Sequence, residues 1–143
     1  MKKTVILIIF IAVIFSCEAG QESNVMNSGF VGRWNWTSTD GGIAFHIHET
    51  PESTGNTIRL YLTEDKEYSV IINDIDVYTG VYEISMERSI YSGELEEYIT
   101  LNGNQPNCCN VVLNGIINHQ ENNTLSISDN CYDGVGSTYK RIN

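Results

Sequence analysis

The fold is decided by two neighbouring segments, Thr57-Ile58-Arg59-Leu60-Tyr61-Leu62-Thr63 and, after three polar residues, Glu67-Tyr68-Ser69-Val70-Ile71-Ile72-Asn73. Successive side chains of an extended strand point to opposite faces, so an alternating apolar pattern predicts a strand with one buried face. In both segments every second residue is apolar, in the order Ile58, Leu60, Leu62, Tyr68, Val70 and Ile72. The connection 64–66 has hairpin length, so we predict an antiparallel pair.

Similar runs rich in Val, Ile, Tyr and Thr recur along the chain between clusters of Gly, Asn, Asp and Ser. No segment shows convincing helical periodicity. Short strands at even spacing predict an all-β fold, either a sandwich or a small up-and-down antiparallel β-barrel of about eight strands. The barrel is favoured because closure leaves no exposed edge strand. The predicted strands are 33–39, 43–48, 57–63, 67–73, 77–86, 96–101, 111–117, 124–128 and 137–142.

Residues 40–56, which include the run 43–48, form the longest interruption of this pattern. Because long loops are often functional, we expect this segment to act as a lid over the mouth of the barrel. His46 and His48 would project to one face of a strand, with Glu49 or Glu52 nearby. We expect no metal there, because no third histidine has metal-site spacing.

The chain begins with Met1-Lys2-Lys3 and continues with an apolar run over residues 5–15. Eleven residues rise only about 16 Å as a helix, roughly half the thickness of a bilayer core. This pattern predicts a signal peptide over residues 1–16 rather than a permanent membrane span.

The apolar run ends in Ile14-Phe15-Ser16-Cys17, which resembles the lipobox of bacterial lipoproteins. The resemblance implies cleavage before Cys17 and attachment of lipid to its sulfur, which would anchor the chain to a membrane. Ordinary secretion, with Cys17 as a spare thiol, is the alternative. Residues 17–28 then form the lipidated cysteine and a polar, flexible tether, and residues 29–143 a single domain. The expected location is the cell envelope, at the outer membrane.

The charge of the chain excludes some partners. Its formal net charge is −10, and Lys2 and Lys3 would leave with the signal peptide. An acidic domain is a poor partner for nucleic acid, so we expect none.

The segment Gly32-Arg33-Trp34 resembles the opening of the first strand in the lipocalin and fatty-acid-binding-protein superfamily. That resemblance implies barrel closure by Trp34, packed against Arg141 of the last strand. Together with the lipobox, Thr50–Gly55 and the ending 129–141, the chain is also similar to lipocalin-like lipoproteins of Bacteroidota. The likeness implies architecture more than activity.

A hollow barrel would bind a small apolar ligand, whereas a filled one would leave the outer face and residues 40–56 to contact an envelope protein as an inhibitor or scaffold. We expect ligand binding first, protein interaction second, and neither catalysis nor a cofactor, because no nucleophile elbow, phosphate loop or dinucleotide fingerprint occurs. The inward residues that would line the ligand pocket are Leu60, Leu62, Tyr68, Val70, Ile72, Tyr82, Ile84, Ile99, Leu101 and Leu113.

Three cysteines remain beyond Cys17: Cys108, Cys109 and Cys131. A hairpin of strands 111–117 and 124–128 would bring the first two near Cys131, and vicinal cysteines on an extended chain point to opposite faces. We therefore predict one disulfide, with Cys109 preferred over Cys108 as the partner of Cys131. A zinc site is disfavoured because adjacent ligands lack the usual spacing.

Acidic residues cluster in the turns Asp74–Asp76 and Asp129–Asp133 and around Glu94, Glu96 and Glu97. The turns lack the ligand ladder of a calcium loop, and the glutamates lack the aromatic cleft of a glycosidase. We interpret all three clusters as turn chemistry or a solvated edge.

Overall fold

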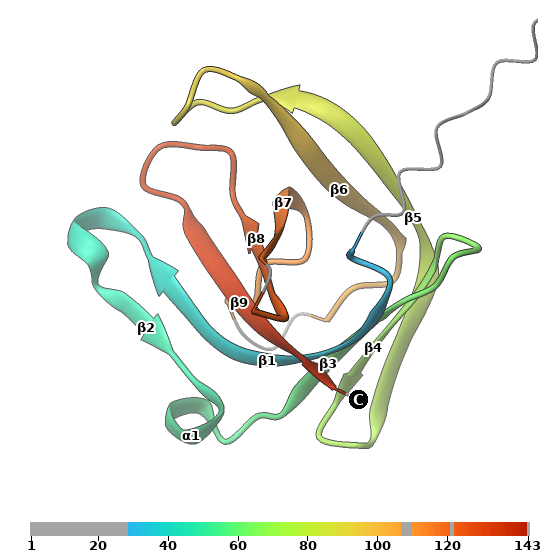
Figure 1. Cartoon of the computed structure of the whole chain (residues 1–143). Helices are drawn as coiled ribbons and strands as arrows, with labels where there is room; N and C mark the ends of the chain where they lie inside the picture. The colour runs from blue at the N-terminus through green and yellow to red at the C-terminus, as the bar shows by residue number, and fades with distance from the viewer. Residues whose placement is uncertain (1–28, 107–109, 121, 143) are drawn as a thin grey trace, which may run out of the picture.

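The computed structural model describes residues 29–106, 110–120 and 122–142. The predicted signal peptide, Cys17, the tether, Cys108 and Cys109 therefore lie outside the described residues. Within them, no helix is long and apolar enough to span a membrane. The elements in chain order (Figure 1) are β1 (Gly32–Gly41), η1 (Ile43–Phe45), β2 (Ile47–Glu49), α1 (Pro51–Thr54), β3 (Ile58–Leu62), β4 (Glu67–Ile72), β5 (Asp76–Arg88), β6 (Leu95–Gly103), β7 (Gly115–Gln120), β8 (Thr124–Ser128) and β9 (Val135–Ile142).

Eight of the strands form a closed antiparallel barrel. From β3 to β9 each strand pairs with the next in sequence, β1 pairs with β3, and β9 closes the barrel by pairing with β1. β2 is an extra strand on the far half of β1. The predicted all-β, up-and-down barrel of about eight strands is confirmed, and its wall curves around a central space (Figure 1).

The β3–β4 hairpin shows how the alternating sequence produces this wall. Ile58, Leu60 and Leu62 lie opposite Ile72, Val70 and Tyr68, and all six are buried. The intervening residues are half exposed or exposed. Directly opposed apolar pairs pack against each other, so the period-two pattern fixes both the register and the inward face.

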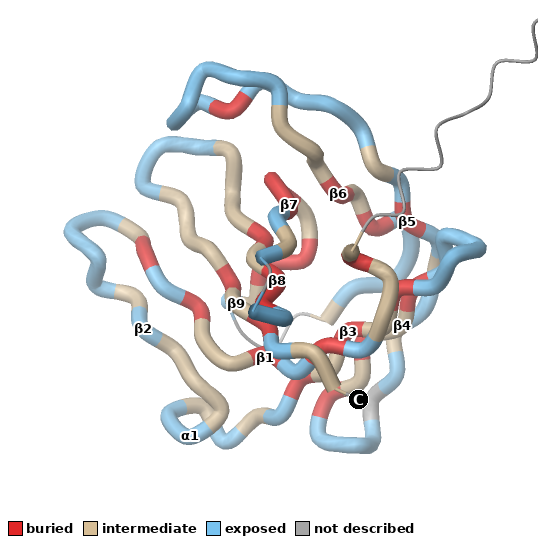
Figure 2. The backbone as a smooth tube through the Cα atoms, in the orientation of Figure 1, coloured by how far each residue is buried: buried red, intermediate tan, exposed pale blue. Residues whose placement is uncertain are grey.

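The interior of the barrel is a single apolar core. Inward side chains from every barrel strand join it, and Figure 2 shows buried positions alternating with exposed ones along the wall. Seven members of this core have a relative exposure of 0%: Trp34, Leu60, Val70, Ile99, Leu125, Ile127 and Tyr139.

The prediction of a strand over 111–117 is wrong at its beginning. β7 starts only at Gly115, and residues 110–114, which we call the crossing segment, run across one end of the barrel. Val112 and Leu113 of this segment are buried in the core. Gly115 makes the change of direction: its φ is +155°, and a Cβ atom there would lie 2.2 Å from the carbonyl oxygen of Ser128. Only glycine fits such an approach.

Residues 40–56 are not a structureless lid. η1 and β2 fold this segment back along β1, with Asp40 opposite His48, and α1 follows at once. The one-turn helix was not expected. It is specified by Pro51 at its first position and by a capping box in which the side chains of Thr50 and Ser53 satisfy each other's backbone N–H groups.

Candidate functional site

The two ends of the barrel wall meet where the Gly-x-Trp resemblance placed them. Trp34 and Arg141 are directly opposed on β1 and β9, and the guanidinium carbon of Arg141 lies 4.2 Å from the centre of the Trp34 ring. Arg141 Nη1 donates to the carbonyl oxygen of Val31 at 2.9 Å, and Nη2 to that of Gly29. Trp34 Nε1 donates to the carbonyl oxygen of Phe30 at 2.7 Å. These contacts tie the first described residues to the last strand.

His119 lies beneath the same closure. Its ring meets the edge of Trp34 at a centroid distance of 5.7 Å. Its Nε2 atom is buried and has no hydrogen-bond partner in the part of the chain that the structure describes. A buried polar atom without a partner costs stability.

The residues predicted to line a ligand pocket do come together, as the core of the barrel. Ile84 is only partly buried against this core, and the others are at most 4% exposed. The hydroxyls of Tyr68 and Tyr82 donate to the carbonyl oxygens of Asn104 and Thr63, and burial raises the pKa of both phenols. The side chains contact one another, and a ligand among them stays a prediction. The fully packed set is Leu60, Leu62, Tyr68, Val70, Ile72, Tyr82, Ile99, Leu101 and Leu113.

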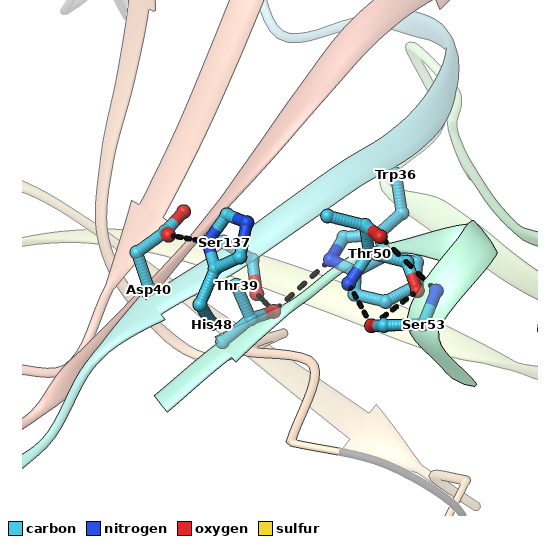
Figure 3. Close-up of polar contacts among 7 residues, drawn as sticks. All are labelled: Trp36, Thr39, Asp40, His48, Thr50, Ser53 and Ser137. Carbon is cyan, nitrogen blue, oxygen red and sulfur yellow. Dashed lines mark hydrogen bonds and ion pairs between the residues drawn. The ribbon is translucent and has the colours of Figure 1, made fainter. Parts of the chain in front are cut away.

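A buried chain of hydrogen bonds, of which Figure 3 shows the part from Trp36 to Ser137, holds the crossing segment in place. Trp36 Nε1 donates to Thr39 Oγ1 at 3.0 Å, and the Thr39 and Ser137 hydroxyls are 2.6 Å apart. The N–H of Val112 donates to Ser137 Oγ at 2.8 Å, and the Tyr139 hydroxyl donates to the carbonyl oxygen of Val112 at 2.5 Å. Both polar backbone groups of Val112 are thus satisfied inside the barrel.

Neighbouring contacts fix the crossing segment at both ends. Asn110 Nδ2 donates to Glu49 Oε1 on β2 at 2.6 Å, and Asn114 Oδ1 accepts the backbone N–H of Leu101 on β6 at 2.6 Å. The segment therefore spans from β2 and β9 to β6. Sequence reasoning missed its role. The available clue was Ser137, a polar residue that shares the inward face of β9 with Tyr139.

A notch of about 270 Å³ opens in the outer wall beside α1. The pairing of β1 with β3 ends at Asn35 and Arg59, and the same edge of β1 pairs again only at Thr39, with β2. The two strands therefore diverge, and the notch lies between them with core residues at its base. The lining residues are Asn35, Trp36, Pro51, Thr57, Ile58, Arg59 and Asp74.

The walls of the notch are fixed by hydrogen bonds within the chain. On one side, the capping box holds α1. On the other, the Asn73 side chain accepts the backbone N–H of Thr57 at 2.8 Å, while the Asn73 N–H donates to the Thr57 carbonyl oxygen at 2.9 Å. Asn73 and Asp74 both have positive φ, as a tight β4–β5 turn requires.

The rim of the notch carries one charge of each sign. A guanidinium nitrogen of Arg59 pairs with a carboxylate oxygen of Asp74. The Arg59 side chain is 34% exposed and Asp74 is 71% exposed. The floor is formed by Trp36 and Ile58, which are almost completely buried. The notch thus combines an apolar floor with a charged rim.

The two histidines predicted to share a face do not do so. His46 ends η1 and its Nδ1 bonds to the carbonyl oxygen of Ile43. His48 on β2 pairs with Asp40, and this hydrogen bond, together with one from Ser38, holds the pKa of Asp40 below its ordinary value (Figure 3). Among the described residues, no group of three His, Cys, Asp or Glu side chains is arranged to hold a metal.

Several residues of the acidic clusters make local structural contacts. Asp74 pairs with Arg59, Asp129 accepts the backbone N–H of Val135 at 3.2 Å, and Glu96 accepts the hydroxyl of Ser92. Cys131 is exposed with a free thiol, and its predicted disulfide partner lies outside the described residues.

Comparison of the sequence with protein families gave no match, and comparisons with curated proteins and with solved structures gave none either. A function for the chain can therefore be inferred only from its sequence and from the arrangement of the described residues. That geometry is compatible with binding, either within the barrel or on its outer wall.

Proposed function

We propose that the chain is a membrane-anchored binding module of the cell envelope that acts through the outside of a filled, lipocalin-like barrel. The observation that carries this proposal is the crossing segment. Val112 and Leu113 fill one end of the interior, and the backbone of Val112 is hydrogen bonded there to Ser137 and Tyr139. A ligand inside the barrel would have to displace these groups and leave them without partners, which is costly.

The anchor is supported by the sequence alone. The lipobox-like Ile14-Phe15-Ser16-Cys17 would place lipid on Cys17, and residues 18–28 would give the barrel reach from the membrane. A Cys17→Ser variant is expected to lose incorporation of labelled palmitate and to leave the membrane fraction. Retention of label by that variant would exclude Cys17 as the attachment site.

An exposed face of the β5–β6 hairpin supports the proposal of a protein partner. β6 pairs with β7 only at Tyr98 and Ile99, so the β5–β6 hairpin extends past β7. Its inward face continues beyond the barrel with Met86 opposite Glu97 and Leu95 opposite Arg88, and the two apolar side chains are at least half exposed. At the tip, the Tyr91 hydroxyl donates to the carbonyl oxygen of Cys131. The face therefore offers two exposed apolar side chains together with one charge of each sign, a combination that a protein partner can contact.

Photo-crosslinking in cells tests this face directly. A photoreactive amino acid at Leu95 is expected to give a discrete adduct with an envelope protein. The same probe at Val81 is the matched control, since Val81 is similarly exposed but lies on the opposite face of β5. Equal adducts from both positions, or none from Leu95, would contradict a partner at this face.

Native mass spectrometry of the detergent-purified chain separates this proposal from apolar ligand binding inside the barrel. We expect the mass of the lipidated chain alone after gentle desolvation. A co-purifying small apolar molecule, lost when interior residues are substituted, would instead support the ligand pocket. For a ligand to bind there, the crossing segment would have to leave the interior of the barrel.

A further inference from the structure

We infer that the notch beside α1 is a binding site for an α-amino acid with an apolar side chain. This site goes beyond the proposed function, because it does not involve the face formed by Met86 and Leu95. It is built by a different part of the wall, where β1 and β3 diverge.

The size of the notch limits its occupant. Its volume of about 270 Å³ lies just below the range of roughly 300–1,000 Å³ typical of sites for drug-sized ligands. A single amino acid fits such a volume. The walls are held by the α1 capping box and by Asn73, so the site is formed before any ligand arrives.

The floor recognises an apolar group. Trp36 Nε1 is already bonded to Thr39, so the indole meets the notch without a free donor. Ile58 and Pro51 complete an apolar surface against which a leucine or phenylalanine side chain would pack. Trp36 and Ile58 are only 2% and 1% exposed, so a ligand side chain would contact a small part of each.

The rim recognises a carboxylate. Arg59 uses one nitrogen for Asp74, and its Nη1 and Nε atoms have no hydrogen-bond partner among the residues that the structure describes. The side-chain amide of Asn35, opposite Arg59 on β1, is likewise unpartnered within the described ranges. Because the N–H groups of Nη1 and Nε lie on different edges of the guanidinium, a ligand carboxylate would accept one charge-assisted hydrogen bond from Arg59 Nη1 and a second hydrogen bond from the Asn35 amide.

The rim also recognises an ammonium group. Asp74 is exposed and contributes a carboxylate next to Arg59, so the two charges match the α-ammonium and α-carboxylate of one zwitterion. A divalent cation would find only one carboxylate in the lining. A wholly apolar ligand would desolvate the charged rim without replacing its contacts with water. A multiply charged anion would be repelled by Asp74 and by the acidic chain.

Calorimetric titration of the detergent-purified full chain tests this site. L-Leucine and L-phenylalanine are expected to bind with one saturable site and to change tryptophan fluorescence through Trp36. Glycine, which has no side chain for the floor, is expected to bind about fivefold more weakly. N-acetyl-phenylalanine, which lacks the ammonium group, and phenethylamine, which lacks the carboxylate, are also expected to weaken by about tenfold.

Two variants assign the binding to the rim. Arg59→Gln and Asp74→Asn are each expected to weaken L-phenylalanine binding by about tenfold. Arg33→Gln is the matched control, because Arg33 lies on β1 over the ring of Tyr61 and does not line the notch. Absence of saturable binding up to about 10 mM, which corresponds to less than roughly 3 kcal/mol, would overturn the inference. Equal binding of N-acetyl-phenylalanine, or equal loss in Arg33→Gln, would overturn it as well.

Discussion

The hydroxyl of Tyr139 donates a hydrogen bond of 2.5 Å to the carbonyl oxygen of Val112 inside the barrel. Tyr139 belongs to β9 and Val112 to the crossing segment, so this contact joins the barrel wall to the segment that fills one end of its interior. Tyr139 has no exposed surface. The Val112 carbonyl group is buried away from water, and the Tyr139 hydroxyl satisfies it instead. The crossing segment is thus part of the packed core.

Tyr139→Phe is expected to lower the free energy of unfolding by about 1–3 kcal/mol, because the buried Val112 carbonyl group loses this partner. Urea denaturation measures the change. Tyr98→Phe is the control, since Tyr98 is half-buried and its hydroxyl makes no hydrogen bond within the described ranges. If both variants lost the same stability, the crossing segment would not depend on Tyr139.

Arg141→Met is expected to lower the free energy of unfolding by about 2 kcal/mol, since it removes the cation–π contact with Trp34 and two charged hydrogen bonds. Thermal and chemical denaturation report the loss. Arg33→Met, which removes a more exposed contact 5.6 Å from the Tyr61 ring, is expected to cost less than about 0.5 kcal/mol. A smaller effect at Arg141 than at Arg33 would contradict closure by this pair.

His119→Phe is expected to preserve stability or raise it by about 1 kcal/mol. The substitution removes a buried Nε2 atom that has no partner among the described residues, and it keeps an aromatic ring against the edge of Trp34. His119→Ala, which leaves a void beside Trp34, is expected to destabilise. A marked loss in the phenylalanine variant would show that Nε2 has a favourable partner.

The Asp40 and His48 pair predicts a small acid-dependent loss of stability. The hydrogen bond from His48 lowers the pKa of Asp40 from its ordinary value of 3.8. A depressed carboxyl pKa stabilises the folded state above pH 3.8, and the contribution disappears as the pH falls through the lower, folded pKa. Carbon NMR titration of the carboxyl group is expected to show the depressed pKa, and His48→Ala to raise it. An unchanged midpoint in His48→Ala would exclude His48 as the cause.

The parts of the fold that could be predicted are those in which each strand buries one face by simple alternation. The β3–β4 hairpin and β8 follow this rule, and their predicted bounds agree with the structure to within a residue. β1 breaks the rule through a register shift between Trp36 and Ser38, which brings Thr39 inward. No local sequence pattern predicts such a bulge.

The parts that could not be predicted depend on contacts between distant residues. The run over 111–117 is apolar because both the crossing segment and β7 are buried, and periodicity alone does not separate these causes. Gly115 lies at the boundary between the two, but the reason for a glycine there is the close approach of Ser128, which is distant in sequence. The notch was missed for the same reason, since it arises where β1 leaves β3.

The most direct test of the filled barrel is an NMR titration of the isotope-labelled chain with a long-chain fatty acid. We expect the Val112 amide to resist hydrogen exchange and the resonances of Val112, Leu60 and Ile99 not to shift. Saturable shifts at these residues, with exposure of the Val112 amide on addition of the fatty acid, would show that the interior opens to ligand and would contradict a filled barrel.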